Sequence, residues 1–267
     1  MGEGVQELGV VQEADRLSVT WVGHSTVLVE AGGVRLLTDP LLRPRIGHLR
    51  RVAPAPAALE GELDAVLISH LHHDHLDLAS LRHVRARQIV VPAGTGRTLA
   101  RRGFGPIVEL EEHEELSVGA LTVRATHAAH TVRRGLWSTR KPALGFVVTG
   151  PRSVYFAGDT GIFDGMRALA PVDVALLPIW GWGPRLGSGH MGPDEAAGAL
   201  RLLMPRLAIP IHWGTYLRVA MPADEATLRA PAERFERLAA ELAPEVAVRV
   251  LVPGERLSLE AAGAGAR

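Results

Sequence analysis

Four of the chain's histidines fall within six residues, at His70, His72, His73 and His75, with Asp74 among them. Imidazole nitrogens and carboxylate oxygens are the atoms that hold a divalent metal ion, at about 2.0–2.2 Å. The spacing His-x-His-x-Asp-His predicts two neighbouring metal sites, with His70 and His72 facing one ion and Asp74 and His75 facing another roughly 3.5–4 Å away. The alternative is a polar surface loop without a metal.

Further potential ligands come directly after predicted strands later in the chain. They are His127 and His130 after 121–126, Asp159 after 153–157, and His212 after 207–211. Taken singly, each has an ordinary alternative, since a loop histidine is commonly exposed or hydrogen-bonded and a Gly-Asp-Thr-Gly sequence suits a turn. Together they complete a set of ligands that leaves a position open for water, which is typical of a catalytic metal site.

The composition narrows the chemistry that these residues can perform. The chain of 267 residues has 29 basic and 29 acidic side chains and no cysteine. Thiolate zinc sites, iron–sulfur clusters and a cysteine nucleophile are therefore excluded, and any metal must be held by His, Asp or Glu. A pI near 7.3 argues against a nucleic-acid partner. No stretch reaches the roughly 18 apolar residues of a membrane span, and the acidic start is unlike a signal peptide, which predicts a cytoplasmic location.

The elements that must position the ligands are short strands with helices between them. Strands are expected at 18–22, 26–30, 34–38, 65–69, 88–91, 121–126, 144–149, 153–157, 174–178, 207–211, 246–252 and 256–259. Helices are expected at 95–102, 163–170, 193–203 and 231–242. Two blocks of strands interleaved with helices predict an α/β fold in which two sheets are covered by helices. We expect an N-terminal extension at 1–16, a single domain over 17–260 and a frayed tail at 261–267.

On these motifs the chain resembles the metallo-β-lactamase superfamily. The matching segments are Thr38-Asp39-Pro40, 70–77, His130, 156–161 and 211–215, in the order of that family and within about residues 17–258. Two further segments, 23–26 and 189–196, resemble the branch that contains ascorbate-phosphate lactonases and N-acyl-phosphatidylethanolamine phospholipases D. The resemblance implies a four-layer αββα sandwich.

The resemblance also implies how the ligands divide between the metals. It places one metal on His70, His72 and His130 and a second on Asp74, His75 and His212, with Asp159 between the two. It favours His130 over His127, and it implies that Asp39 supports the ligand loop. The metals would be one or two Zn²⁺ ions per chain, with Mn²⁺ as the alternative.

The implied activity is that of a metal-dependent hydrolase, in which a metal-bound hydroxide attacks a small ester, lactone or phosphodiester. Asp74 would orient the hydroxide as well as bind metal. His190 would protonate the leaving group or contact the substrate, unless it merely caps the helix at 193–203. His24 either reaches the metal pocket or supports a turn. The alternative functions are a di-iron redox enzyme of the same fold and a mononuclear Mn²⁺ lactonase.

Basic residues follow two of the ligand segments and predict an anionic small-molecule substrate, if they rim the site. They are Arg43, Arg45, Arg50 and Arg51 after Asp39, and Arg133, Arg134, Arg140 and Lys141 after His130. The alternative is that both segments are solvated loops. The remaining histidines, His48, His83 and His113, are expected on the surface, and His73 is expected to point away from the metals. The oligomeric state is not predicted.

Overall fold

The computed structural model describes residues 16–131, 141–183 and 186–260, so the expected tail and all but the last residue of the expected extension lie outside it. One sheet consists of β1 (Leu17–Gly23), β2 (Thr26–Ala31), β3 (Val34–Thr38), β6 (Ala65–Leu67), β7 (Ile89–Pro92), β8 (Ile107–Leu110) and β17 (Arg256–Leu259). Their order across the sheet is β17-β1-β2-β3-β6-β7-β8. The strands from β17 to β3 pair antiparallel and those from β3 to β8 pair parallel.

A second sheet repeats this topology with the later part of the chain. It consists of β9 (Glu115–Val118), β10 (Leu121–His127), β11 (Leu144–Thr149), β12 (Val154–Phe156), β13 (Val174–Pro178), β14 (Leu207–Ile211) and β16 (Ala247–Val248). Their order is β16-β14-β13-β12-β11-β10-β9. Again the antiparallel pairs, from β9 to β12, precede the parallel pairs, from β12 to β16.

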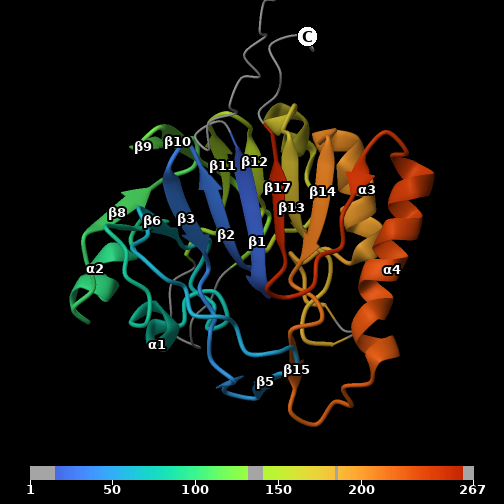
Figure 1. Ribbon diagram of the computed structural model, residues 1–267, viewed down its shortest axis with the longest axis horizontal. Helices are drawn as coiled ribbons and strands as arrows, with labels where there is room; N and C mark the ends of the chain where they lie inside the picture. The colour runs from blue at the N-terminus through green and yellow to red at the C-terminus, as the bar shows by residue number, and fades with distance from the viewer. Residues whose placement is uncertain (1–15, 132–140, 184–185, 261–267) are drawn as a thin grey trace, which may run out of the picture.

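Helices cover the outer faces of the two sheets (Figure 1). They are α1 (Leu78–Leu81), α2 (Gly96–Ala100), the 3-10 helix η2 (Asp164–Leu169), α3 (Pro193–Leu203) and α4 (Glu225–Leu242). In Figure 1, α1 and α2 lie on the left and α3 and α4 on the right. No helix among the described residues is long and apolar enough to cross a membrane.

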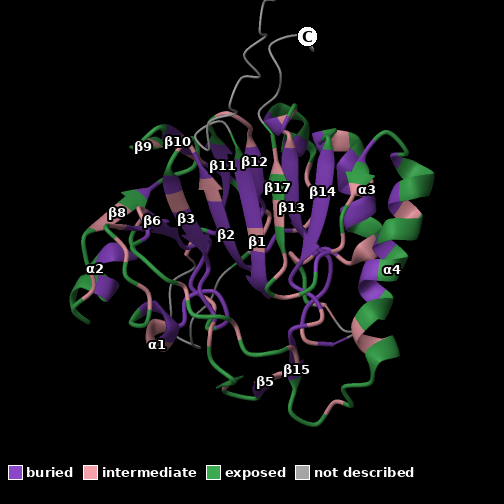
Figure 2. Cartoon of the chain, viewed as in Figure 1, coloured by how far each residue is buried: buried purple, intermediate pink, exposed green. Residues whose placement is uncertain are grey.

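Side chains that alternate between the two faces of a strand pack into two different hydrophobic layers. In β2, Val27 and Val29 belong to the main core between the sheets, whereas Leu28 belongs to a second cluster that includes Leu81 of α1 and Leu99 of α2. Successive side chains of a strand point to opposite faces, so a strand that is apolar at every position is buried on both faces. The strands are accordingly buried almost throughout, while the outer face of α4 is exposed (Figure 2). The predicted four-layer α/β sandwich is confirmed.

Three predicted elements differ from the structure in type or by more than two residues, and α1, β8 and β9 were not among the expected elements. The strand expected at 246–252 is reduced to β16, and the helix expected at 163–170 is the 3-10 helix η2. The last helix was expected to begin at Pro231, but it begins at Glu225. Asp224 caps it, since its Oδ1 accepts a hydrogen bond from the Thr227 amide at 2.8 Å, and this capping bond outweighs the preference of proline for a first turn.

A small third sheet was not predicted. Its strands are β4 (Arg45–Ile46), β5 (Leu49–Arg51) and β15 (Tyr216–Arg218), in the order β15-β5-β4. With two or three residues each, these strands are too short for a period-2 pattern to show in the sequence. The sheet lies below the two large sheets in Figure 1. It therefore lies next to the edge at which the segments that follow β1, β3, β6, β10, β12 and β14 come together.

Candidate metal centre

Eight side chains converge at this edge in two groups. One group is His70, His72, His130 and Asp159, and the other is His24, Asp74, His75 and His212. Within each group the potential ligand atoms all lie within 4.8 Å of one another. The structure thus brings together all seven residues that the sequence singled out as ligands, and it adds His24.

The first group gathers three imidazoles from two separate strand ends. The Nδ1 atom of His72 lies 3.0 Å from Nε2 of His70 and 3.2 Å from Nε2 of His130. Oδ2 of Asp159 lies 3.8 Å from Nε2 of His70. One nitrogen of each imidazole therefore faces a common centre, with a carboxylate beside it.

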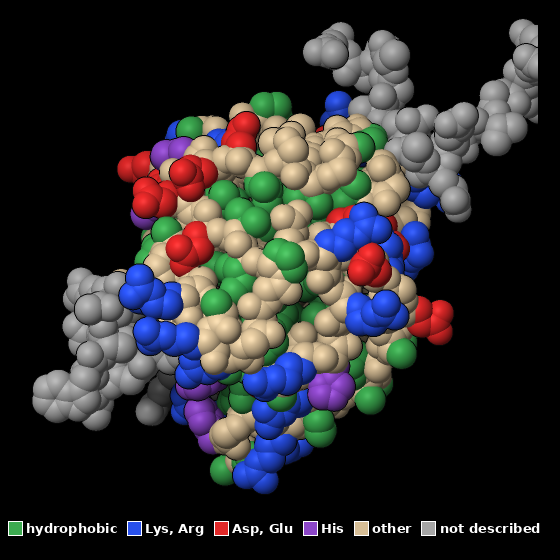
Figure 3. All heavy atoms as spheres, turned by 90° about the vertical axis from the view of Figure 1, so that its left-hand side faces the viewer, with side chains coloured by type: hydrophobic (Ala, Val, Ile, Leu, Met, Phe, Trp, Pro, Cys, Tyr) green, Lys and Arg blue, Asp and Glu red, His purple; other side chains and the backbone are tan. Residues whose placement is uncertain are grey.

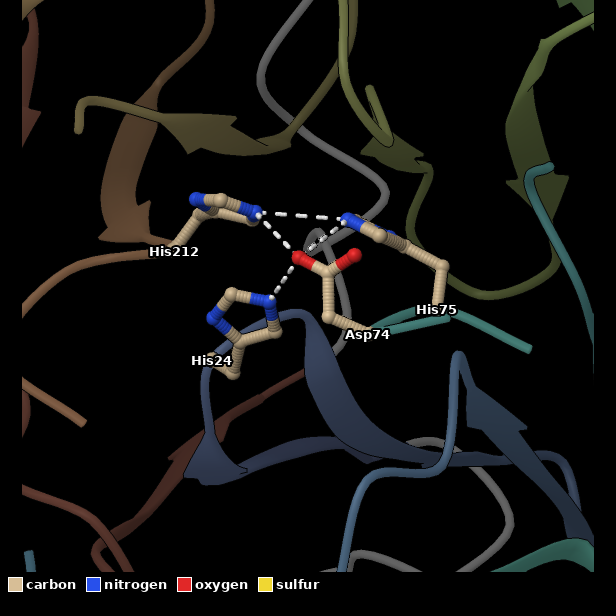
Figure 4. Close-up of side chains that lie close together, drawn as sticks. All are labelled: His24, Asp74, His75 and His212. Carbon is tan, nitrogen blue, oxygen red and sulfur yellow. Dashed lines mark hydrogen bonds and ion pairs between the residues drawn. The ribbon is translucent and has the colours of Figure 1, made fainter. Parts of the chain in front are cut away.

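The second group meets around the same aspartate. The Nε2 atoms of His75 and His212 lie 3.3 Å apart, and they lie 3.2 Å from Oδ2 and 3.3 Å from Oδ1 of Asp159, respectively. Oδ2 of Asp74 lies 3.7 Å from the former nitrogen and 3.8 Å from the latter (Figure 4). Asp159 consequently lies between the two groups, and its buried Oδ1 has no hydrogen-bond partner among the described residues.

Backbone carbonyls determine which nitrogen of two imidazoles carries a hydrogen. Nδ1 of His130 lies 2.8 Å from the carbonyl oxygen of Gly189, and Nδ1 of His212 lies 3.0 Å from that of Trp180. A carbonyl oxygen only accepts, so each Nδ1 must donate. In the neutral rings the Nε2 atoms therefore have no hydrogen and direct their lone pairs into the cluster.

Asp39 determines the orientation of two more rings from behind the ligand loop. It is fully buried and accepts hydrogen bonds from the Ser69 amide, from the Ser69 hydroxyl and from Nδ1 of His75. Because the Ser69 hydroxyl donates to Asp39, it accepts from Nδ1 of His70, 2.9 Å away, which leaves Nε2 of His70 without a hydrogen. Burial raises the pKa of Asp39, although the hydrogen bond from His75 opposes this change.

Burial and charge divide the histidines of the cluster into two kinds. Burial lowers the pKa of His130 to about 4 and that of His212 to about 3, so both are neutral at pH 7. Burial acts in the same direction on His75, but the carboxylates of Asp159 and Asp74 outweigh it and raise the pKa of His75 well above its usual value.

The two carboxylates are ionised despite their burial. Burial alone would raise their pKa values, but the surrounding imidazoles, His75 foremost for Asp74 and His212 foremost for Asp159, hold both well below the usual range. Their negative charges lie in a buried space beside the lone pairs of the neutral imidazoles. Converging lone pairs, a buried oxygen without a partner and these charges fit a divalent cation held by nitrogen and oxygen ligands.

Three residues of this centre have strained backbone conformations. His24, Asp39 and His212 have positive φ angles of 56°, 32° and 62°, in the left-handed region that costs a non-glycine residue free energy. The amide of His212 donates to the carbonyl oxygen of His24 at 2.9 Å, so two of these turns stabilise each other. Such strain is found where the surrounding structure fixes a functional geometry.

His24 contacts Asp74, so it does more than support a turn. Its Nε2 lies 3.0 Å from Oδ2 of Asp74, and the indole Nε1 of Trp182 donates to the same oxygen at 2.9 Å. A nitrogen that donates a hydrogen to a carboxylate offers no lone pair to a metal, so His24 supports Asp74 in this arrangement. The contact from Trp182 was missed in the sequence, because no spacing links residues 108 positions apart.

His190 reaches the centre from the loop before α3. Its Nε2 lies 3.2 Å from Oδ2 of Asp159, and this bond raises its pKa above the usual value although burial opposes the change. The capping alternative is wrong, since Glu195 accepts from the Gly192 amide at the start of α3. His190 instead borders a cleft of about 470 Å³, which is lined by Ile46, Gly47, His48, Leu49, His72, His73, Asp74, Trp182 and His190.

The other histidines are placed partly as expected. His127 is exposed and pairs with Glu112 at 3.0 Å, so it is His130 that joins the cluster. His83 and His113 are exposed. His48 is exposed as well, but it lines the cleft together with His73, a position that the sequence did not indicate.

The four described arginines after Asp39 do not line the cleft. Arg43 donates to Asp77, Arg45 to the carbonyl of Gly47, Arg50 to that of Met221, and Arg51 to those of Pro54 and Val22. Lys141 donates to the carbonyl of Gly94, and Arg133, Arg134 and Arg140 lie outside the described residues. Basic and histidine side chains nevertheless gather along the lower edge of the face that carries α1 and α2 (Figure 3).

Comparison with known proteins places the chain in a family. Residues 34–213 match the family described as "Beta-lactamase superfamily domain". A metal-dependent hydrolase of Methanopyrus kandleri is 33% identical over 260 residues, which covers 90% of this chain and 98% of that protein. An N-acyl-phosphatidylethanolamine-hydrolyzing phospholipase D of Caenorhabditis elegans is 35% identical over 235 residues, 75% of this chain and 64% of that protein.

A solved structure agrees in fold. The metallo hydrolase Igni18 of Ignicoccus hospitalis superposes with a TM-score of 0.69 at 25% identity, covering 92% of this chain and 99% of that protein. The matched region of the family includes the ligand loop after β6, Asp159 and His212, so the residues that converge in space also lie within the part of the chain that the family shares.

Proposed function

The chain belongs to the metallo-β-lactamase superfamily of metal-dependent hydrolases, and from this premise we propose that it hydrolyses a small ester, lactone or phosphodiester with two divalent metal ions. His70, His72 and His130 would hold one ion, and Asp74, His75 and His212 the other. Asp159 would contact both, because its two oxygens face both groups. Zn²⁺ is the proposed metal, with Mn²⁺ as the alternative, since imidazole and carboxylate ligands suit both.

The single observation that carries this proposal is that one cleft opens onto both groups. His72 of the first group and Asp74 of the second both line it, and His190 borders it from the other side. Divalent ions held by these residues would lower the pKa of a nearby water and polarise the oxygen of the scissile group. A substrate seated in the cleft therefore meets the reacting centre and a proton donor together.

The protein's own residues have separate tasks in this reaction. Asp74 is held by two hydrogen-bond donors, so its carboxylate can orient the attacking water in one direction. His190 borders the cleft, and its Nε2 lies at hydrogen-bond distance from Asp159, so a protonated imidazole would face a substrate bound there. It can then deliver a proton to the leaving oxygen as the bond breaks, which is the task of a general acid.

Metal analysis combined with a substrate panel tests this proposal. Untagged protein should be stripped with a chelator, reloaded with Zn²⁺ or Mn²⁺ and analysed for metal by mass spectrometry. We expect about two ions per chain, together with turnover of at least one ester, lactone or phosphodiester that is lost on chelation and restored by metal. Reloaded protein that holds no metal, or turnover that persists in chelator, would contradict the proposal. Bound iron with visible absorption would instead support the di-iron alternative.

A further inference from the structure

The cleft over the metal centre has an apolar wall that the proposed reaction does not require. Ile46 and Leu49 come from the β4–β5 hairpin, and Trp182 comes from the loop after β13. Together with Leu41 and Tyr216 they form a hydrophobic cluster that is separate from both larger cores. A hydrophobic cluster beside a polar metal centre can form one wall of a binding site for an apolar ligand.

Trp182 belongs both to this wall and to the metal centre. Its indole Nε1 donates to Oδ2 of Asp74 at 2.9 Å, while its ring packs with the hydrophobic cluster. The imidazole of His48 meets the indole edge to face, with ring centroids 5.8 Å apart. One side chain thus contacts a carboxylate that faces the reacting centre and also forms part of the wall that a bound molecule would touch.

The charges around the cleft favour an apolar group over an anionic one at this wall. Among the described residues, its lining contains no lysine or arginine. The volume of about 470 Å³ is in the range of pockets that bind small organic molecules. Burying an alkyl or aryl group against Ile46, Leu49 and Trp182 removes apolar surface from water on both partners, which is favourable.

We propose that this cleft binds an alkyl or aryl group of the substrate against Ile46, Leu49 and Trp182, and that Trp182 is a positioning residue that holds Asp74 through its indole nitrogen. The proposal rests on the proposed hydrolase function for its kinetic consequences, but the binding of the apolar group does not depend on turnover. It narrows the substrate class to esters, lactones or phosphodiesters with an apolar substituent beside the scissile bond.

A contact probe tests binding without any reaction. Bromine quenches tryptophan fluorescence on contact, so metal-free protein should be titrated with 8-bromo-1-octanol, with 1-octanol as the control. We expect saturable quenching of the wild-type protein that is mostly lost in Trp182→Phe. Ile46→Asp should raise the probe concentration needed for half-maximal quenching at least tenfold. Val252→Asp places the same charge on an exposed apolar residue outside the cleft and should leave this concentration unchanged.

Kinetics with p-nitrophenyl esters of increasing acyl length test the two tasks of Trp182. In the wild type we expect kcat/KM to rise about fourfold per methylene group until the cleft is filled, and Ile46→Asp should flatten this rise. Trp182→Phe keeps an aromatic ring and loses the donor, so kcat should fall roughly tenfold to a hundredfold while KM for the longest ester stays within about twofold. Trp182→Ala should raise KM as well.

The outcomes separate this inference from the proposed function. Quenching that is absent, or that is equal in the wild type, Trp182→Phe and Ile46→Asp, overturns the apolar cleft even if the protein is an active hydrolase. Saturable quenching that depends on these residues supports the cleft even if no ester, lactone or phosphodiester is turned over. Equal kcat values for the wild type and Trp182→Phe on an ester that both hydrolyse would refute the positioning role of the indole nitrogen.

Discussion

Nδ1 of His75 donates to Oδ2 of Asp39 at 2.7 Å, and both side chains are fully buried. Asp39 directly follows β3, while His75 lies in the loop after β6, the parallel neighbour of β3. The pair therefore connects the segments that follow two adjacent strands and turns Nε2 of His75 toward the cluster. A ligand whose second nitrogen is fixed in this way needs little reorganisation when a metal binds.

Replacing Asp39 by Asn should weaken metal binding without unfolding the protein. Asn has nearly the same shape but no charge, so it loses the charge-assisted bonds from His75 and Ser69. We expect a decrease in Zn²⁺ affinity of about tenfold to a hundredfold, measured by competition with a chromophoric chelator. Asp194→Asn removes an exposed carboxylate paired with Arg234 and serves as the control. Equal affinities in the two variants would argue against the orienting role of Asp39.

Much of the fold follows from the sequence because its strong signals are local. The strands at 174–178 and 207–211 and the helix at 193–203 have the predicted bounds, since each is a buried apolar run or an amphipathic segment with a clear start. The β4–β5 hairpin and β15 were not predictable in this way. Their pairing, with Tyr216 opposite Arg51, joins segments about 165 residues apart in the sequence and has no local pattern.

The same difference between local signals and contacts of distant segments applies to the candidate site. Residue types and strand ends indicated the histidines and aspartates, because parallel strands bring their carboxyl ends to one edge. Supporting contacts such as the one from Trp182 to Asp74 depend on how distant loops meet. The choice between His127 and His130 depended on the direction of a loop, which brings only His130 to the cluster.

Alanine substitutions at His127 and His130 form a matched pair for metal stoichiometry. His130 faces His72 within the first group, whereas His127 is exposed and pairs with Glu112. We therefore expect His130→Ala to bind one metal ion less than the wild type, or to bind it at least tenfold more weakly. His127→Ala should keep full metal content, measured by mass spectrometry after reloading. Loss of metal in His127→Ala alone would reverse the assignment.

Acid should destabilise the metal-free protein before its carboxylates titrate. The pKa values of His130 and His212 are lowered to about 4 and about 3, so below about pH 6.5 the unfolded chain binds protons that the folded chain does not. The free energy of unfolding should fall with pH from about 6.5 to about 4, by up to about 1.4 kcal/mol per pH unit for each histidine. His75, whose pKa is raised, contributes stability that is already complete below pH 6.5.

Urea unfolding in the presence of chelator, at intervals between pH 7.5 and 4.5, measures this dependence. His212→Gln replaces one of these rings by a side chain that does not titrate, so its free energy of unfolding should depend less steeply on pH. His83→Gln, at an exposed position, should keep the wild-type slope. A wild-type free energy of unfolding that does not change between pH 6.5 and 4.5 would show that these imidazoles are not buried in their neutral form.

His190→Ala should impair turnover while leaving the metals in place. The imidazole of His190 lies at the cleft and contacts Asp159, and loss of a general acid lowers rates by about 100-fold to 10,000-fold. The decrease should be largest for substrates with alkyl alcohol leaving groups, which need a proton, and smallest for p-nitrophenol, which leaves as an anion. Metal content by mass spectrometry should equal that of the wild type.

The pH profile distinguishes a proton donor from a residue that only shapes the cleft. A donor must be protonated, so wild-type kcat should decline on the alkaline side as the imidazole of His190 loses its proton. In His190→Ala this alkaline decline should disappear for alkyl esters, because the group that titrates is gone. If the variant instead keeps the decline and loses activity equally on all leaving groups, His190 acts by contact with the substrate, and the proton must come from elsewhere.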